Sequence, residues 1–131
     1  MKLRLKTTQN RQIVDITDDV ADVLREAGNK TGVVMVSAQH TTCALTTADL
    51  DPGTDQDFLD FLNSLIPDIE WRHPHDSAHA PSHLLSSLIG TAVIVPVNDG
   101  QLKLGNWQRI ILVELDGPRQ RELTLNFLPS T

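Results

Sequence analysis

The chain has 131 residues, of which 40% are hydrophobic and 21% are charged, and these proportions are typical of one globular domain spanning residues 1–131. Its net charge of −6 and its lack of long basic runs exclude an electrostatic nucleic-acid or membrane-surface binder. The N-terminus lacks a signal peptide's apolar core, no apolar run approaches the ~20 residues of a membrane span, and Cys43 is the only cysteine, so we predict a cytoplasmic protein.

The first half of the chain predicts four strands and one helix. Leucine and basic residues alternate over residues 2–6, the pattern of a half-buried strand, and residues 11–16 are its expected hairpin partner. A helix from Thr17 to Gly28 has an apolar stripe, an N-cap threonine, aspartates near its positive end and a glycine stop. Residues 32–37 are apolar on both faces and predict a central, buried strand, and residues 41–47 predict another.

Two helices are predicted in the middle of the chain. The first begins at Thr54, which resembles the start of a capping box, and stops at Pro67. Its side chains expected to face inward are Phe58, Phe61, Leu62 and Leu65. The second begins at Pro81, whose missing N–H costs nothing in a first turn, and ends at Gly90. The side chains expected to anchor this second helix are Leu84, Leu85, Leu88 and Ile89.

The last third of the chain predicts strands. Asn98-Asp99-Gly100 is a strong hairpin signal between residues 92–97 and residues 101–104. Residues 116–119 are a tight turn that joins residues 108–115 to residues 121–128 in a second expected hairpin. The expected fold class is therefore α+β: a single compact domain with a large, mostly antiparallel β-sheet or sandwich and two to three helices.

Histidines are the strongest functional signal in the sequence. Four of the five fall within eleven residues, at His73, His75, His79 and His83. Pro81 opposes one helix running through all of them, so we expect a loop that brings one or two histidines beside His83, in the first turn of the second helix. His40 follows a strand and is the expected third nitrogen donor, and three neutral imidazoles with open positions are typical of a catalytic zinc site. For His75 and His79 the alternative is an exposed loop without function.

Charged residues supply a second set of hypotheses. Arg119 and Arg121 lie at i and i+2 beside a turn and would form a receptor for phosphate or carboxylate, or else pair with nearby acidic side chains. The acidic side chains that would compete are Glu114, Asp116 and Glu122. Four aspartates between residues 49 and 57 are candidates for a general base or a hard cation, or for helix capping. Cys43 lies in a β-like run and is interpreted as a small buried hydrophobic residue.

Several segments together resemble one family. They are His40-Thr41-Thr42, His73 after an aromatic-Arg pair, the run from His83 to Gly90, Leu104-Gly105-Asn106-Trp107-Gln108, and the run from Glu114 to Arg121. In this order, and over essentially the whole chain, they resemble the YjbQ-like family, also described as secondary thiamine-phosphate synthase. The resemblance implies a single YjbQ-like domain over residues 1–131, an α+β fold, a homotrimer, and sites between subunits where histidines hold a metal.

The family's functional residues carry over by position. The resemblance implies that His40, His73 and His83 bind the metal, a divalent ion that we expect to be zinc, with magnesium as the alternative for pyrophosphate chemistry. It implies a catalytic role for Asp49, where Ala48-Asp49 replaces an expected Asn-Glu pair. It also implies catalytic and substrate-binding roles for the two arginines and substrate binding by Trp107 and Gln108. His79 stands where the family often has asparagine, and would be an additional ligand.

The expected function is that of a metal-dependent small-molecule enzyme. The ion would act as a Lewis acid toward a small anionic or phosphorylated metabolite held by Arg119 and Arg121, with phosphorylated pyrimidine and thiazole substrates if the activity is thiamine-phosphate synthesis. One alternative is a zinc-type hydrolase that uses a metal-bound hydroxide. The other is a non-catalytic trimeric protein that binds a metal or a metabolite. No nucleic-acid or membrane partner is expected.

Overall fold

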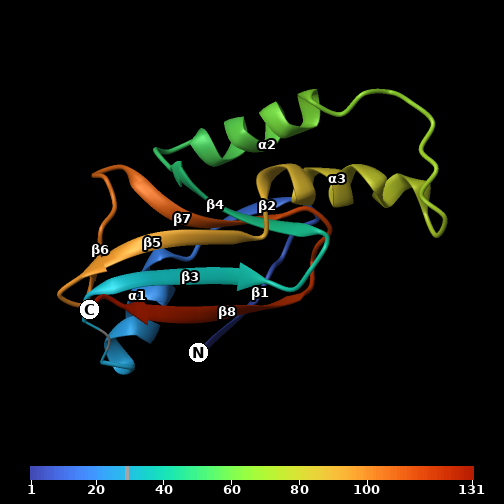
Figure 1. Cartoon of the computed structure of the whole chain (residues 1–131). Helices are drawn as coiled ribbons and strands as arrows, with labels where there is room; N and C mark the ends of the chain where they lie inside the picture. Colours follow the sequence, from blue (N-terminus) through green and yellow to red (C-terminus); the bar gives the residue numbers. More distant parts are fainter. Residues whose placement is uncertain (29) are drawn as a thin grey trace.

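The computed structural model describes residues 1–28 and 30–131 (Figure 1). In chain order its elements are β1 (Lys2–Lys6), β2 (Gln12–Asp15), α1 (Thr17–Glu26), β3 (Gly32–Ala38), β4 (Cys43–Asp49), α2 (Thr54–Ser64), the 3-10 turn η1 (Ser77–His79), α3 (Ala80–Ile89), β5 (Ala92–Asn98), β6 (Gln101–Leu102), β7 (Gln108–Glu114) and β8 (Gln120–Pro129).

The strands of the described residues form two antiparallel sheets that pack as a sandwich. One sheet has five strands in the order β1-β8-β3-β5-β6, and the other has three strands in the order β2-β7-β4. Figure 1 shows α2 and α3 lying together over the three-stranded sheet, on the side away from the five-stranded sheet. The expected α+β fold with a mostly antiparallel sandwich and three helices is therefore confirmed.

The strand β7 is the centre of the fold because both of its faces are covered. Ile110 and Leu112 point into the core between the two sheets, whereas Ile111 and Val113 point toward α2 and α3. All four side chains are fully buried. This explains why the sequence of β7 is a continuous apolar run and shows no alternation. The helix α1 adds to the first core through Ile16, Val20 and Leu24 (the first just before the helix).

Two expected hairpins are wrong, and for the same reason. β1 pairs with β8, and β2 pairs with β7, so residues 2–6 and 11–16 belong to different sheets. Likewise β7 and β8 lie in different sheets, so residues 116–119 form a connection between layers. Short turns are compatible with both arrangements, and burial of the apolar faces of β7 and β8 in one shared core selects the crossing. The expected hairpin at residues 98–100 is confirmed, with left-handed φ values of 52° at Asp99 and 80° at Gly100.

The helices begin and end close to the expected positions, but α2 and α3 bury fewer of their apolar side chains than expected. Pro81 lies in the first turn of α3, and Gly90 ends it with a left-handed φ of 109°. The side chains expected to face inward but found exposed are Phe61, Leu65, Leu84 and Leu88. The expected N-cap threonines are the first residues of α1 and α2 instead, and neither helix has a side-chain cap. Within the described residues no helix combines the length and apolar character needed to cross a membrane.

Candidate functional site: the histidine hollow

Three segments that are distant in the sequence meet at one end of the sandwich and enclose a hollow of about 450 Å³. They are the β3–β4 loop, the start of α3 with η1, and the connection between β7 and β8. We call this the histidine hollow, and its lining residues are Gln39, His40, Thr41, Thr42, His79, His83, Asp116, Arg119 and Arg121. The structure thus brings His40 and His83 together with both predicted arginines.

His83 is held in place by the helix on which it lies. Two buried serines of α3 tie the helix to both neighbouring strand ends: Ser82 Oγ donates to the Leu115 carbonyl at 2.8 Å, and Ser86 Oγ donates to the Cys43 carbonyl at 2.6 Å. The His83 imidazole is then fixed by Nδ1, which donates to the Thr41 carbonyl at 3.1 Å. Because a carbonyl oxygen only accepts, this bond places a proton on Nδ1, so in the neutral imidazole Nε2 is the nitrogen with the lone pair. A backbone carbonyl bound to one ring nitrogen is the usual support of a metal-binding histidine.

The loop before α3 places a second histidine against the first. The ring of His73 is stacked on that of His83, with centroids 4.8 Å apart and planes inclined by 19°. His73 Nδ1 accepts a long hydrogen bond of 3.5 Å from the amide of Asp76. His75 contacts His73 edge-on at 6.2 Å between centroids and does not line the hollow. His79 lies in the hollow wall, where its Nε2 is 3.6 Å from Oδ2 of Asp76.

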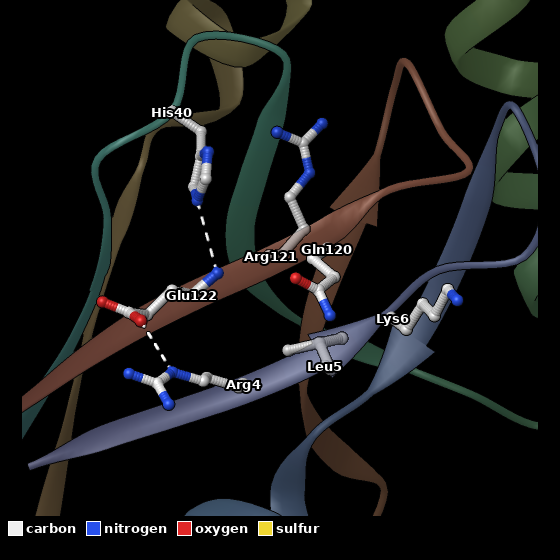
Figure 2. Close-up of a pocket in the computed structure, with 7 residues that line it drawn as sticks. All are labelled: Arg4, Leu5, Lys6, His40, Gln120, Arg121 and Glu122. Carbon is white, nitrogen blue, oxygen red and sulfur yellow. Dashed lines mark hydrogen bonds and ion pairs between the residues drawn. The ribbon is translucent and has the colours of Figure 1, made fainter.

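His40 approaches from the β3–β4 loop and is half-buried. Figure 2 shows its Nε2 directed at the backbone amide of Glu122 on β8, from which it accepts a long hydrogen bond of 3.4 Å. In this arrangement the lone pair of Nε2 is directed at β8 and is already engaged by the Glu122 amide. A shared metal would therefore require the His40 ring to turn.

The donor chemistry of the histidine hollow suits a zinc-type ion, but its present arrangement supplies one ready ligand. His83 offers a free Nε2, whereas His40 is bonded to Glu122 and the His73 ring lies nearly parallel to that of His83. Among the described residues no three His, Cys, Asp or Glu side chains are already grouped as a metal would need them. His40 and His83 thus line the same hollow, and the His73 ring is stacked on that of His83.

The two arginines have different environments. Arg121 is buried, and its side chain is only 1% exposed, whereas that of Arg119 is 47% exposed. Arg121 makes a two-point ion pair with Glu114 through Nε and Nη2, and Nη2 also donates to the carbonyl and hydroxyl oxygens of Thr42 at 3.0 and 2.9 Å. Arg119 donates through Nη2 to Oδ2 of Asp116 at 2.8 Å. Of the two alternatives that the sequence left open, the structure shows ion pairing for both arginines: Arg121 is held inside the wall by Glu114, whereas Arg119 pairs with Asp116 and stays partly open to solvent. Anion binding by these arginines stays a prediction.

Glu114 is the buried acid that organises this wall, and sequence reasoning gave it no functional part. One of its oxygens accepts from the Thr7 hydroxyl at 2.7 Å, and the other accepts from the amides of Leu115 and Asp116. Burial alone would raise the pKa of Glu114, but hydrogen bonds from Arg121 and Thr7 outweigh it and hold the pKa below the ordinary value of 4.5. The sequence does contain a signal for this pair: Glu114 ends the apolar strand β7, and a carboxylate buried in such a strand requires a charged or hydrogen-bonding partner.

This lowered pKa predicts a dependence of stability on pH. The unfolded chain takes up a proton near the ordinary glutamate value, while native Glu114 stays ionised, so the unfolding free energy should fall as the pH drops below 4.5. Asp15 and Glu122, whose pKa values are also lowered, add to the same loss. Urea unfolding at about pH 6 and about pH 3.5 should show a smaller change in midpoint for Glu114→Gln than for the wild type. An equal change would contradict this role of Glu114.

Cys43 lies directly beneath the histidine hollow but does not take part in it. It is fully buried, and burial raises the pKa of its thiol to about 11. A thiol in this state is protonated and inert at neutral pH. The interpretation of Cys43 as a small buried hydrophobic residue is confirmed.

Comparison with known proteins gives one consistent result. The family model described as "UPF0047 protein YjbQ-like" matches residues 1–130. The chain belongs to the UPF0047, YjbQ-like family. A UPF0047 protein of Archaeoglobus fulgidus is 40% identical over 129 residues, which cover 98% of this chain and 100% of the relative. The UPF0047 protein YugU of Bacillus subtilis is 35% identical over 123 residues, 91% of each chain.

Two solved structures share the YjbQ-like fold. A hypothetical protein from Aeropyrum pernix K1 has a TM-score of 0.91 and 34% identity, and the match covers 99% of this chain and 98% of that one. A YbjQ-like protein of unknown function from Sulfolobus solfataricus P2 has a TM-score of 0.92 and 32% identity, with coverage of 99% and 96%. The predicted family is therefore confirmed.

The remaining residues that the YjbQ-like resemblance selected lie elsewhere in the chain. Asp49 and Trp107 line a separate hollow of about 220 Å³, where β4 ends and β7 begins. Asp49 is opposite Gln108 in the register of these strands, and the Gln108 side chain donates to Thr47 Oγ1 at 3.0 Å. Since β4 starts beside the histidine hollow at Cys43, its seven residues separate the two sites by about 20 Å. One chain does not bring Asp49, Trp107 or Gln108 to the histidines.

Proposed function

We propose that this chain is a metal-dependent enzyme acting on a small anionic or phosphorylated metabolite, and that its site is the histidine hollow. The observation that carries the proposal is the meeting of His40, His83 and the exposed Arg119 around one hollow from three distant segments. Residues placed in this way on a rigid sandwich are typical of a binding or catalytic site. His40, His73 and His83 would hold a divalent ion, zinc by donor type, and the ion when bound would supply Lewis-acid chemistry.

The chain's own groups have distinct roles in this proposal. Arg119 would bind the anionic group of the substrate, exchanging part of its contact with Asp116 for a charge-assisted bond to the ligand. Arg121 and Glu114 would position the β3–β4 loop, because Arg121 grips Thr42 two residues after His40. The Thr41 carbonyl would keep His83 in the tautomer that has a free Nε2.

The specific reaction that we propose is thiamine-phosphate formation, as the family resemblance implies. The thiazole nitrogen would attack the pyrimidine methylene carbon, forming a C–N bond while the C–O bond to pyrophosphate breaks. The departing pyrophosphate carries away the electron pair of that bond. A cationic group beside the leaving group lowers the barrier, and Arg119 is placed to serve as that group.

Replacing Arg119 by glutamine tests this assignment. With the pyrimidine pyrophosphate, the thiazole phosphate and a divalent ion, we expect the variant to lose about tenfold to a hundredfold in kcat/KM, since one charge-assisted contact to the leaving group is removed. Arg25→Gln is the matched control, because Arg25 pairs with Asp22 at the same i, i+3 spacing on the exposed face of α1. No metal-stimulated product from the wild type would overturn the thiamine assignment. A panel of phosphate esters and lactones then distinguishes a hydrolase from a protein that only binds.

We also infer that the protein acts as a homotrimer. The support is the family resemblance, together with the distance between the histidine hollow and the group of Asp49, Trp107 and Gln108 within one chain. A neighbouring subunit would bring the second group to the first. Sedimentation equilibrium giving the mass of a single chain would contradict the trimer. The cytoplasmic location stays a prediction.

A further inference from the structure

A second hollow, of about 400 Å³, lies on the other side of His40 (Figure 2). It is formed where the end of β1 meets the start of β8, and we call it the cationic hollow. Its lining residues are Arg4, Leu5, Lys6, His40, Gln120, Arg121 and Glu122. It shares His40 and Arg121 with the histidine hollow but contains neither His83 nor Arg119.

Charge is unevenly distributed around the cationic hollow. The even-numbered residues of β1 are Lys2, Arg4 and Lys6, and all three are exposed on the strand face opposite Leu3 and Leu5. Two of the three contact a carboxylate, that of Glu122, which accepts from Lys2 Nζ at 2.6 Å and from Arg4 Nε at 2.8 Å. Those two hydrogen bonds lower the pKa of Glu122 to about 2. In a chain with a net charge of −6, this face of β1 is a local excess of positive charge.

The excess is not neutralised by the protein itself. Within residues 1–28 and 30–131, Lys6 makes no ion pair, and Arg4 uses only its Nε, which leaves the two terminal nitrogens of its guanidinium group available. The carboxamide of Gln120, opposite Lys6 in the strand register, has no hydrogen-bond partner among these residues. The hollow therefore presents several N–H donors from three side chains, a set that suits a compact oxyanion.

We propose that the cationic hollow binds a phosphate group, supplied either by free phosphate or by a phosphorylated metabolite. Arg4 would offer its terminal N–H pair, Lys6 a single charged donor and Gln120 a neutral donor. A volume of about 400 Å³ exceeds that of a phosphate group alone and leaves room for part of a small molecule. The site requires no metal, so it stands or falls separately from the function proposed above.

Its position gives the site a consequence for the histidine hollow. The imidazole of His40 borders both hollows, and its Nε2 contacts the amide of Glu122 at the floor of the cationic one. A phosphate oxygen bound there would compete with His40 Nε2 for the amide of Glu122. Loss of this hydrogen bond would favour rotation of the His40 ring toward His83. Two anion-binding positions on either side of one histidine also match a reaction that joins two phosphorylated substrates.

Lys6→Gln is the decisive variant, because Lys6 is exposed and its loss does not disturb an ion pair within the described residues. Calorimetric titration with inorganic phosphate should show binding to the wild type and about tenfold weaker binding to Lys6→Gln. Lys2→Gln is the matched control: Lys2 lies on the same face of the same strand and contacts Glu122, but does not line the hollow. It should change the affinity by less than about twofold.

Further titrations distinguish free phosphate from a phosphate monoester as the ligand, and the cationic hollow from other parts of the protein as the site. Titration with methyl phosphate in parallel shows whether the site takes a phosphate monoester as well as free phosphate, and dependence on Lys6 in either titration supports the proposal. Arg25→Gln should leave phosphate binding unchanged, since Arg25 pairs with Asp22 on α1 and lines neither the cationic hollow nor the histidine hollow. Equal affinity for Lys6→Gln and the wild type, or equal weakening by Lys2→Gln and Lys6→Gln, would overturn it.

Discussion

Replacing Arg121 by alanine is expected to lower the free energy of unfolding by about 3–5 kcal/mol. The substitution leaves the fully buried Glu114 without its charged partner and leaves Thr42 without the guanidinium group that bridges to it. An uncompensated buried carboxylate costs far more than the loss of the ion pair itself. Urea unfolding at neutral pH, monitored by tryptophan fluorescence, measures the change.

Two further variants make this expectation specific to the buried pair. Arg119→Ala should cost less than about 1 kcal/mol, because its ion pair with Asp116 is partly exposed and screened by solvent. The double variant Arg121→Met with Glu114→Leu should recover part of the lost stability, since both charges are removed together, while the Thr7 hydroxyl and the Asp116 amide lose their acceptor. A loss below about 1 kcal/mol for Arg121→Ala would show that Glu114 is not confined as the structure indicates.

Replacing His83 by alanine is expected to weaken zinc binding at least about 100-fold. Among the histidines and their contacts within the described part of the chain, His83 is the one whose Nδ1 is bound to a backbone carbonyl and whose Nε2 makes no hydrogen bond. Its loss also removes the surface on which the His73 ring is stacked, so two of the three proposed ligands are affected. Competition with a chromophoric chelator, with protein that carries no histidine tag, measures the affinity.

His75→Ala is the control for this second prediction. His75 lies in the same loop, contacts His73 only edge-on and does not line the histidine hollow. Its removal should change the zinc affinity by less than about twofold, because no ligand is lost. Wild-type affinity in His83→Ala would exclude His83 as a ligand, whatever the remaining histidines do.

The sequence predicted most elements because their signals are local. Alternation of leucine with basic residues specified β1, Asp99-Gly100 specified the turn between β5 and β6, and Pro81 and Gly90 specified the ends of α3. Each of these signals acts within a few residues. Strand partners are different, since they depend on which apolar faces share a core, and this is why both wrong hairpins joined neighbours in the sequence.

The faces of α2 and α3 could not be resolved by periodicity alone. Leu85 and Leu62 are buried against the three-stranded sheet, while Leu84, Leu88 and Phe61 on adjacent turns are exposed. Both sets are apolar, so the sequence indicates a wide apolar stripe without showing which part meets the sheet. Of the exposed side chains, Leu84 and Leu88 line a shallow apolar groove between α3 and the segment that follows α2.

The sequence selected several residues that line the histidine hollow, but not the buried interactions that hold them in place. His40, His83 and Arg119 were selected because imidazole is a common metal ligand and neighbouring guanidinium groups suit an anion, and all three line the histidine hollow. The buried partnership of Arg121 with Glu114 was weighed as the alternative, and it is what the structure contains. The supporting bonds from Ser82 and Ser86 run to backbone carbonyls, which no side-chain pattern reveals.

A zinc-soaked crystal shows whether histidines from separate segments bind one metal ion, as we propose. In an anomalous difference map at the zinc edge, we predict one peak per chain at about 2.0–2.1 Å from a ring nitrogen of each of His40, His73 and His83. The map would also show the His40 ring turned away from the Glu122 amide. A peak held by other residues, or no peak at a zinc concentration well above the measured affinity, would contradict the claim.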